Sequence, residues 1–264
     1  MKDMDIMVTL WPSFPHFIRF ASDRRLSGIR LNSAMIDVAD LDQELALLPE
    51  NPETPLYFDI KGRQLRITEV YPNTDHLEIS LNHPLHVETP TVVLFKAGAD
   101  RALLSEIAED GRLIFDGGPQ YMVRAGESLH IRHPSLAVGG SQFTDLELQK
   151  IEKVKKVGFK RWFLSYVENQ RDVDEFTELV GKDCEIMLKI ENTKGLEYVE
   201  REFKKRDGLR LVAAQGDLYV EVKRPHHILS AMKLIIENDP QAIVGSRMML
   251  SVVPNPIMPS CAAV

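Results

Sequence analysis

Short apolar runs alternate with amphipathic segments from about residue 144 onward. The runs predict buried strands, and the segments, whose apolar positions recur every three or four residues, predict helices. Strands that alternate with helices of about 10–15 residues are typical of right-handed βαβ units and a parallel sheet. The predicted helices cover 144–157, 172–180, 194–205 and 227–237, and the predicted strands cover 161–167, 184–190, 209–214 and 242–245.

The first of these helices has a clear start signal. Thr144 and Glu147 form the pattern of a capping box, in which the threonine oxygen accepts an orphan amide hydrogen and the glutamate reaches back. Gly158 supplies the matching end signal.

The amino-terminal part carries the same type of element, but the middle of the chain does not. Strands are predicted over 6–10, 28–31 and 56–59, with a helix over 41–48. Between about residues 66 and 138 the segments become short and rich in turn residues, which predicts a mostly β insertion after the third strand of a barrel. We expect a barrel from 1–66 and 139–264, interrupted by an insertion at 67–138. Within that insertion the sequence predicts strands over 77–81, 91–95, 112–115, 121–123 and 128–131, and a helix over 102–109.

Composition narrows the functional classes. The net charge is −7 and the 32 lysines and arginines are scattered, so a nucleic-acid partner is not expected. No apolar run approaches the ~18 residues of a membrane span, and the charged start does not resemble a signal peptide. Two cysteines, Cys184 and Cys261, lack metal-ligand spacing and fit a reducing compartment. We therefore expect a cytoplasmic protein with no membrane partner.

Charged residues follow two neighbouring predicted strands. Lys189 and Glu191 lie at the end of one, and Asp217 lies just after the next. A lysine and two carboxylates at the carboxyl ends of parallel strands can hold a divalent metal beside a cation. Such a set can stabilise an enolate or a transferring phosphoryl group.

Several motifs, taken in order, resemble those of the pyruvate kinase family. The resemblance covers almost the whole chain and is strongest toward its end. It implies an α/β fold of the TIM-type (β/α) barrel class with a β-rich lid insertion after the third strand. The first motif, at 6–13, keeps the family's Thr9 and Pro12. The second reads Gly-Ile-Arg-Leu-Asn-Ser at 28–33, and the third reads Phe-Asp-Ile-Lys-Gly-Arg-Gln-Leu-Arg at 58–66. The others lie at 163–167, 187–192 and 214–221.

The resemblance also implies roles for individual residues. Lys189 would sit against the transferred phosphoryl group and the enolate oxygen, and Arg30 would neutralise that phosphoryl group. Glu191 and Asp217 would bind Mg²⁺ or Mn²⁺, which prefer carboxylate oxygens. The other implied residues are Ala214, Gln215, Gly216, Ser246 and Arg247 for substrate binding, Asn32 and Asp59 for a monovalent cation such as K⁺ and for phosphate, Pro12 and Arg66 for the nucleotide, and Ser165 behind the site.

Departures from the family pattern leave the reaction open. Gln215 stands where the family has an arginine, Arg247 near its strand-seven threonine, and Ile60 at its third-strand threonine. The leading hypothesis is a glycolytic, Mg²⁺-dependent phosphotransferase that acts on phosphoenolpyruvate and a nucleoside diphosphate. The alternatives are a metal-dependent lyase or aldolase that uses the same enolate site, and a non-catalytic homologue that binds a ligand or partner. We expect a small-molecule substrate and a homo-oligomer.

Two further expectations concern the histidines and the closure of the barrel. The pairs His83 with His86 and His130 with His133 have a spacing that places strand side chains on opposite faces, so they are predicted to be surface or turn residues. The family barrel has eight strands, and the sequence predicts seven here. Since seven strands leave edge hydrogen bonds exposed, we expect a fragment of a longer protein; the alternatives are a partner or an altered topology that closes the gap.

Overall fold

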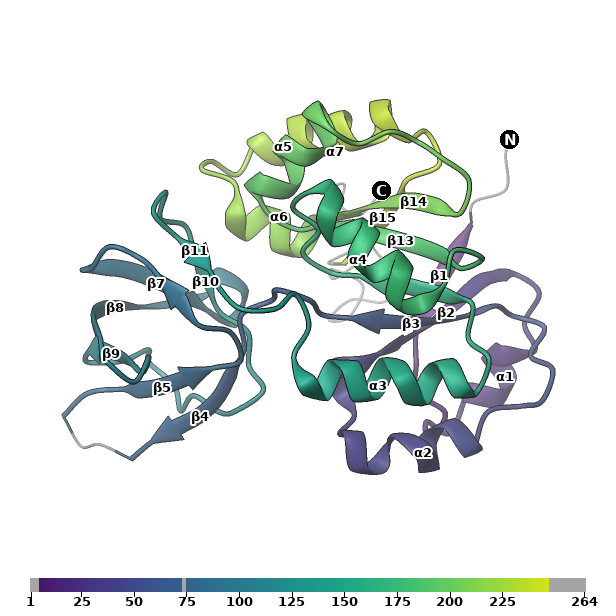
Figure 1. Ribbon diagram of the computed structural model, residues 1–264, viewed down its shortest axis with the longest axis horizontal. Helices are drawn as coiled ribbons and strands as arrows, with labels where there is room; N and C mark the ends of the chain where they lie inside the picture. Colours follow the sequence, from purple (N-terminus) through teal and green to yellow (C-terminus); the bar gives the residue numbers. More distant parts are fainter. Residues whose placement is uncertain (1–4, 73–74, 247–264) are drawn as a thin grey trace, which may run out of the picture.

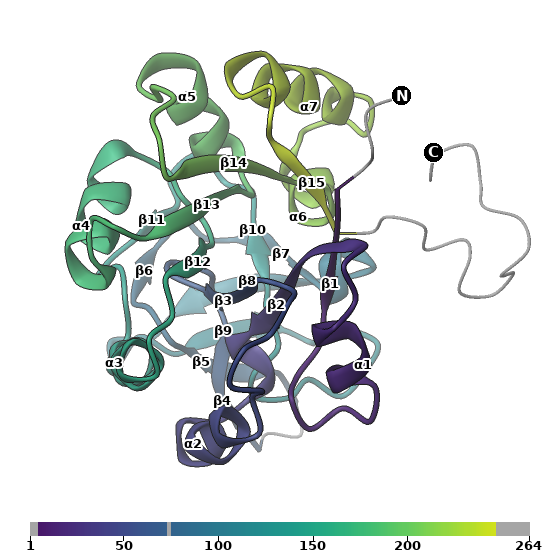
Figure 2. The same cartoon turned by 90° about the vertical axis from the view of Figure 1, so that its right-hand side faces the viewer.

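The computed structural model describes residues 5–72 and 75–246 of the protein. Seven parallel strands form one curled sheet in the order β1-β2-β3-β12-β13-β14-β15 (Figures 1 and 2). This order confirms the barrel-type α/β fold that the sequence predicts. The strands are β1 (Ile6–Thr9), β2 (Leu26–Asn32), β3 (Leu56–Ile60), β12 (Arg161–Leu164), β13 (Glu185–Ile190), β14 (Leu209–Ala214) and β15 (Ile243–Gly245).

Helices cover the outer face of this sheet (Figure 2). Aromatic side chains fill the space between the two layers; Trp162 on β12, for example, makes an edge contact with Phe176, with ring centroids 5.9 Å apart. The inner face has a smaller apolar cluster that includes Phe163 and Met187, so these strands are buried on both faces, as is usual in parallel sheets. The helices are α1 (Phe17–Ala21), α2 (Val38–Ala46), α3 (Asp145–Lys156), α4 (Gln170–Val180), α5 (Thr193–Arg201), α6 (Gln215–Glu221) and α7 (His227–Asn238), with a short 3₁₀ helix η1 (Ser33–Met35) after β2.

The segment after β3 is an antiparallel β insertion with its own apolar core around Phe95 and Phe115. Its six-stranded sheet has the order β10-β7-β8-β9-β5-β4, and β6 pairs with β11 (Figure 1). The strands run from Ile67 to Val138, as expected; that they form a separate domain stays a prediction. They are β4 (Ile67–Tyr71), β5 (Glu78–Leu81), β6 (Leu85–His86), β7 (Thr91–Phe95), β8 (Asp100–Ile107), β9 (Leu113–Asp116), β10 (His130–Ile131) and β11 (Ala137–Val138), with a 3₁₀ helix η2 (Lys96–Gly98).

Two elements of the insertion were predicted wrongly. No strand forms over 121–123, because that segment pairs with no neighbour and connects β9 to β10. The expected helix at 102–109 is instead strand β8, which pairs with β7 on one side and β9 on the other. Ala102 and Leu104 are buried while Leu103 between them is 39% exposed, so the side chains alternate with the period of a strand. Pairing on both sides overrides the helix propensity of alanine, leucine and glutamate.

The capping box at the start of α3 is confirmed, and it also joins two distant parts of the chain. Glu147 Oε2 accepts a hydrogen bond from the Thr144 amide at 3.1 Å. Its other oxygen, Oε1, accepts from the backbone amides of Lys61 at 3.0 Å and Gly62 at 2.9 Å. Glu147 therefore ties the segment where the chain leaves the barrel to the segment where it returns.

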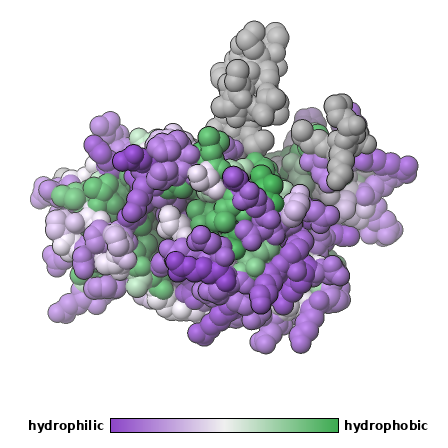
Figure 3. All heavy atoms as spheres, turned by 90° about the horizontal axis from the view of Figure 1, so that it is seen from above, coloured by the Kyte–Doolittle hydropathy of each residue, from purple (hydrophilic) through white to green (hydrophobic). Residues whose placement is uncertain are grey.

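The outside of the molecule is mixed in character. The face shown in Figure 3 is largely hydrophilic, with smaller hydrophobic patches between the polar side chains. Among the described residues, β1 and β15 are the end strands of the parallel sheet, and neither pairs with the other. In the same part of the chain no helix combines the length and apolar character needed to cross a bilayer.

Candidate functional site

The carboxyl ends of three adjacent strands bring a lysine and two carboxylates together. Lys189 shares the inner face of β13 with Met187, and its Nζ donates a hydrogen bond to Ser165 Oγ at 2.7 Å. Ser165 Oγ in turn donates to Asp59 Oδ1 at 3.1 Å, just past the paired ends of β3 and β12. The Lys189 ammonium also lies 2.9 Å from Glu191 Oε1 and 3.7 Å from Asp59 Oδ2.

Asp59 is surrounded by cations. Its side chain is fully buried, and Oδ2 accepts hydrogen bonds from Arg30 Nε at 2.7 Å and Lys61 Nζ at 2.7 Å. Burial alone would raise the pKa of Asp59, but Arg30, Lys189 and Lys61 outweigh it and hold the pKa well below the usual range. Charges of both signs therefore meet here: Arg30, Lys61 and Lys189 lie around Asp59, and the carboxylates of Glu191 and Asp217 also act on Lys189.

Burial and charge act in opposite directions on the two lysines. Burial disfavours a charged Lys189, but the carboxylates of Asp59 and Glu191 prevail and raise its pKa. Burial lowers the pKa of Lys61 to about 7; the Asp59 carboxylate opposes this change, but the charges of Lys189 and Arg30 add to the effect of burial. Lys189 is therefore the stable ammonium of the site at neutral pH.

Glu191 and Asp217 differ in how much freedom they have. Glu191 is fully buried, and its Oε2 accepts a hydrogen bond from the Tyr166 amide at 2.8 Å. Tyr166 holds that amide in place with a left-handed backbone (φ 53°). Burial raises the pKa of Glu191 despite the opposing charge of Lys189. Asp217, in the first turn of α6, has a side chain that is 25% exposed.

The predicted substrate-binding residues lie around the start of α6. Ala214 precedes the helix, which begins at Gln215, and the Gly216 amide donates a hydrogen bond to Ser246 Oγ at 2.7 Å. Two predicted substrate contacts therefore satisfy one another. Arg247 lies outside the described residues.

The residues expected near a monovalent cation or a nucleotide already have internal partners. Asn32 Oδ1 accepts from the Ala34 amide at 3.3 Å and caps η1, so neither Asn32 nor the Asp59 carboxylate described above is unpartnered for K⁺. Arg66 donates to Gln64 Oε1 at 2.6 Å and to the Gly126 carbonyl at 2.6 Å. Pro12 is buried in the turn after β1.

The prediction for the histidines was wrong at two positions. His83 is 4% exposed, and its Nε2 lies 3.0 Å from the Gly62 carbonyl oxygen. His130 is 2% exposed, and its Nδ1 lies 2.8 Å from Glu221 Oε1 on α6. Because β10 ends at Ile131, the face alternation assumed for a longer strand does not apply. A usable signal was the four-residue spacing of Asp217 and Glu221, which places both carboxylates on one helix face.

Glu191 and Asp217 carry the oxygen donors that a divalent cation prefers. In residues 5–72 and 75–246, no three histidine, cysteine, aspartate or glutamate side chains are already arranged around a metal position. Mg²⁺ needs fewer, because it commonly takes one or two carboxylates and completes its shell with water and substrate oxygens. Glu191 and the more accessible Asp217 supply such a pair. In addition, His130 Nε2 is a buried atom without a hydrogen-bond partner among the described residues, 3.6 Å from Asp217 Oδ1.

Known proteins similar to this chain are pyruvate kinases. The enzyme of Thermoplasma acidophilum is 26% identical over 95% of this chain and 49% of its own length. The Methanocaldococcus jannaschii enzyme is 25% identical over 84% of this chain and 51% of its own, and pyruvate kinase 1 of Saccharomyces cerevisiae is 26% identical over 85% and 50%. No protein-family model matches the chain. The chain is thus distantly homologous to pyruvate kinases, and it spans about half the length of these curated relatives.

Proposed function

We propose that this distant homologue of the pyruvate kinases is a Mg²⁺-dependent phosphotransferase that acts on phosphoenolpyruvate or pyruvate and a nucleoside diphosphate. The observation that carries the proposal is the position of Lys189. Its ammonium lies at the carboxyl ends of the parallel strands, within 2.9 Å of Glu191 and 2.7 Å of Ser165. Active sites of barrel enzymes lie at this end of the strands.

The proposed chemistry uses charges that the fold has already placed. Phosphoryl transfer depends mainly on positioning and on neutralising the charge that spreads over the transferred group. Lys189 supplies a fixed positive charge for the enolate oxygen, and Ser165 and Glu191 hold its ammonium in place. Arg30 adds a second cation on the neighbouring strand β2.

Glu191 and Asp217 are the proposed ligands of the divalent cation. When bound, Mg²⁺ or Mn²⁺ supplies Lewis-acid stabilisation of oxygen charge. The chain itself contributes the orientation of these carboxylates. The Tyr166 amide fixes Glu191, and α6 presents Asp217 from its first turn.

A coupled assay with phosphoenolpyruvate, ADP and Mg²⁺ tests the proposal. Lys189→Met should lower kcat by about 10²–10³-fold, the usual loss for one electrostatic stabiliser of a transition state. Lys182→Met is the matched control, because Lys182 is an exposed lysine beside the opposite end of β13. Equal activity of the parent and Lys189→Met, or no ATP formation by the parent, would reject the assignment. Circular dichroism confirms that both variants are folded.

A second candidate is metal-dependent enolate chemistry on a 2-keto acid, as in a lyase or aldolase. It is favoured by the state of Arg30 and Arg66, the two arginines expected to meet phosphate groups. Arg30 is bonded to Asp59 and to Thr9, and Arg66 is bonded to Gln64 and Gly126. Mg²⁺-dependent exchange of the methyl protons of pyruvate, without formation of ATP, would select this candidate over the first.

A further inference from the structure

The β insertion contacts the helix that carries the candidate metal ligand Asp217. Arg132, which follows β10, donates from Nη1 to the Val222 carbonyl at 3.2 Å, directly after α6. The 3₁₀ helix η2 of the insertion also packs against α6. Between these contacts the buried His130 reaches Glu221 and Asp217. The insertion therefore delivers one imidazole to the edge of the candidate site.

The two ring nitrogens of His130 face different carboxylates, and only one of them forms a hydrogen bond among the described residues. Nδ1 lies 2.8 Å from Glu221 Oε1 and 3.4 Å from the Tyr166 hydroxyl oxygen. Because a carboxylate can only accept, Nδ1 carries the proton of the shorter hydrogen bond, to Glu221. In a neutral imidazole Nε2 is then an acceptor. It lies 3.6 Å from Asp217 Oδ1, another acceptor, and has no hydrogen-bond partner among the described residues. A buried acceptor that faces a carboxylate oxygen without a hydrogen bond is unfavourable, and a cation bound by both atoms removes that cost.

We propose that His130 is a nitrogen ligand of the divalent metal at this site, beside Asp217, and that Glu221 orients it. A carboxylate that receives the other ring N–H of a metal-bound histidine is the common arrangement in metalloproteins, since it fixes the tautomer and makes the ligand more basic. Ligand atoms about 2.1 Å from one ion lie about 3.0–3.6 Å apart for angles of about 90–118°. The observed separation of 3.6 Å fits this range.

The proposal rests on the metal site of the proposed function but not on phosphoryl transfer. It specifies the class of metal, because imidazole nitrogen suits Mn²⁺, Co²⁺ and Zn²⁺ better than Mg²⁺, which prefers oxygen ligands. It also explains what the contact between the insertion and α6 would do, namely bring two metal ligands together. The two parts would be joined through one ion, with Asp217 from α6 and His130 from β10.

Pulsed electron paramagnetic resonance of the Mn²⁺ complex tests this directly, because a coordinated imidazole gives a ¹⁴N coupling. The parent protein should show this coupling. In His130→Gln it should disappear, and the Kd for Mn²⁺ should rise by about 10-fold or more. Glu221→Gln should keep the coupling and weaken Mn²⁺ binding by about 10-fold, since it changes only the orienting group. His86→Gln is the control, because His86 is an exposed histidine in the same insertion.

The outcomes separate this proposal from the proposed function. Mn²⁺ bound by the parent without ¹⁴N coupling would overturn the role of His130, whether or not the protein forms ATP; His130 would then only form an ion pair with the two carboxylates. A coupling that persists in His130→Gln would overturn it as well. A ¹⁴N coupling lost in His130→Gln, in a protein that forms no ATP, would support the ligand and reject the phosphotransferase. If His130→Gln does not fold, Glu221→Gln and the parent still test the proposal: a parent spectrum without ¹⁴N coupling overturns it, and Mn²⁺ binding unchanged in Glu221→Gln overturns the orienting role of Glu221.

Discussion

Strands β13 and β14 have charged side chains at both ends, and the two ends differ in burial. At the carboxyl end, the side chains of Lys189 and Glu191 are 12% and 0% exposed and lie 2.9 Å apart. At the amino end, Glu185 and Arg210 are 31% and 32% exposed and lie 4.0 Å apart. Burying a charge is costly, and the buried pair of Lys189 and Glu191 lies where the candidate chemistry lies.

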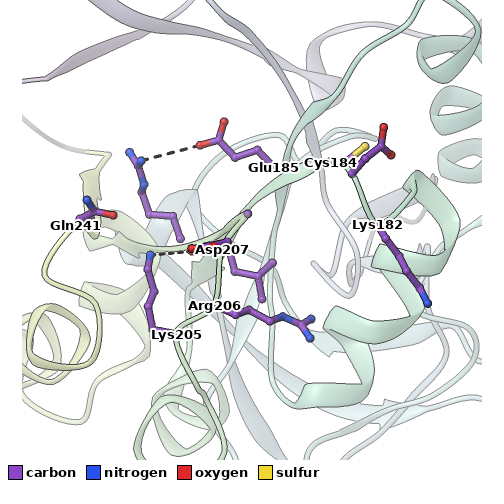
Figure 4. Close-up of a pocket in the computed structure, with 11 residues that line it drawn as sticks. Lys182, Cys184, Glu185, Lys205, Arg206, Asp207 and Gln241 are labelled. Atoms are coloured by element: carbon purple, nitrogen blue, oxygen red, sulfur yellow. Dashed lines mark hydrogen bonds and ion pairs between the residues drawn. The ribbon is translucent and has the colours of Figure 1, made fainter.

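A cavity lies at the amino end. Its volume is about 450 Å³, and it is lined by Lys205, Arg206, Glu185 and neighbouring residues (Figure 4). Its charged side chains are of both signs and partly solvated, so it offers no concentrated charge of one sign. A hollow is therefore a weaker guide to function in this protein than the convergence of buried charges.

The largest effect on stability is expected at Asp59. Asp59→Asn removes a fully buried carboxylate from among Arg30, Lys61 and Lys189, and leaves these cations without their shared partner. Breaking a buried ion pair at one partner costs about 3–5 kcal/mol in the free energy of unfolding. Chemical denaturation of parent and variant measures the difference. If the free energy of unfolding fell by less than about 1 kcal/mol, the buried charges at the carboxyl end would matter no more for stability than the exposed charges at the amino end.

A smaller effect is expected at Asp239, a buried carboxylate near the amino ends of the strands. Its Oδ2 accepts hydrogen bonds from the Leu211 amide at 2.8 Å and from Lys205 Nζ at 2.9 Å. Asp239→Asn should lower the free energy of unfolding by about 1–3 kcal/mol, the usual effect of impairing buried hydrogen bonds. Thermal denaturation of both proteins at neutral pH provides the measurement, and unchanged midpoints would show that these bonds are dispensable.

The same residue predicts a pH dependence. Burial would raise the pKa of Asp239, but the hydrogen bonds from Lys205, Leu211 and Gln241 outweigh it and lower the pKa in the folded protein. The folded state therefore holds the charged form, which adds stability above the unfolded pKa of about 4 and loses it as the pH falls through the lower folded value. The difference between the parent and Asp239→Asn should narrow on acidification below about pH 4. A difference that widens there would contradict this assignment.

The smallest effect is expected for the exposed pair. Glu185→Gln should change the free energy of unfolding by no more than about 0.5 kcal/mol. Its ion pairs with Arg161 at 3.4 Å and Arg210 at 4.0 Å are partly solvated, and the amide oxygen of glutamine can still accept from the Tyr57 hydroxyl. Kinase or proton-exchange activity should also stay at the parent level. If Glu185→Gln impaired activity as strongly as Lys189→Met, the amino end would have to be considered part of the functional site.

Local sequence patterns predicted the parts of the structure that depend on near neighbours. Thr144 and Glu147 lie three residues apart, and their capping box is confirmed. The position of Lys189 and Glu191 at the carboxyl end of a strand could be predicted from that strand alone. The order of the parallel strands could be predicted from the alternation of strands and helices. Their proposed roles in binding metal and substrate stay predictions.

The remaining features depend on contacts between distant segments. His130 and Glu221 are 91 residues apart, so no local spacing indicates that they meet. Strand β8 has a helix-like composition, and its neighbours in the insertion sheet decide its conformation. The network around Asp59 needs strands β2, β3 and β13 together before its three cations can be recognised.

Glu147 has a consequence for the modularity of the chain. Its two carboxylate oxygens bind Lys61 and Gly62 on the outgoing segment and Thr144 on the returning one. One side chain thus holds the two ends of the β insertion together. The separation of these two ends is set by Glu147 and not by the strands of the insertion between them.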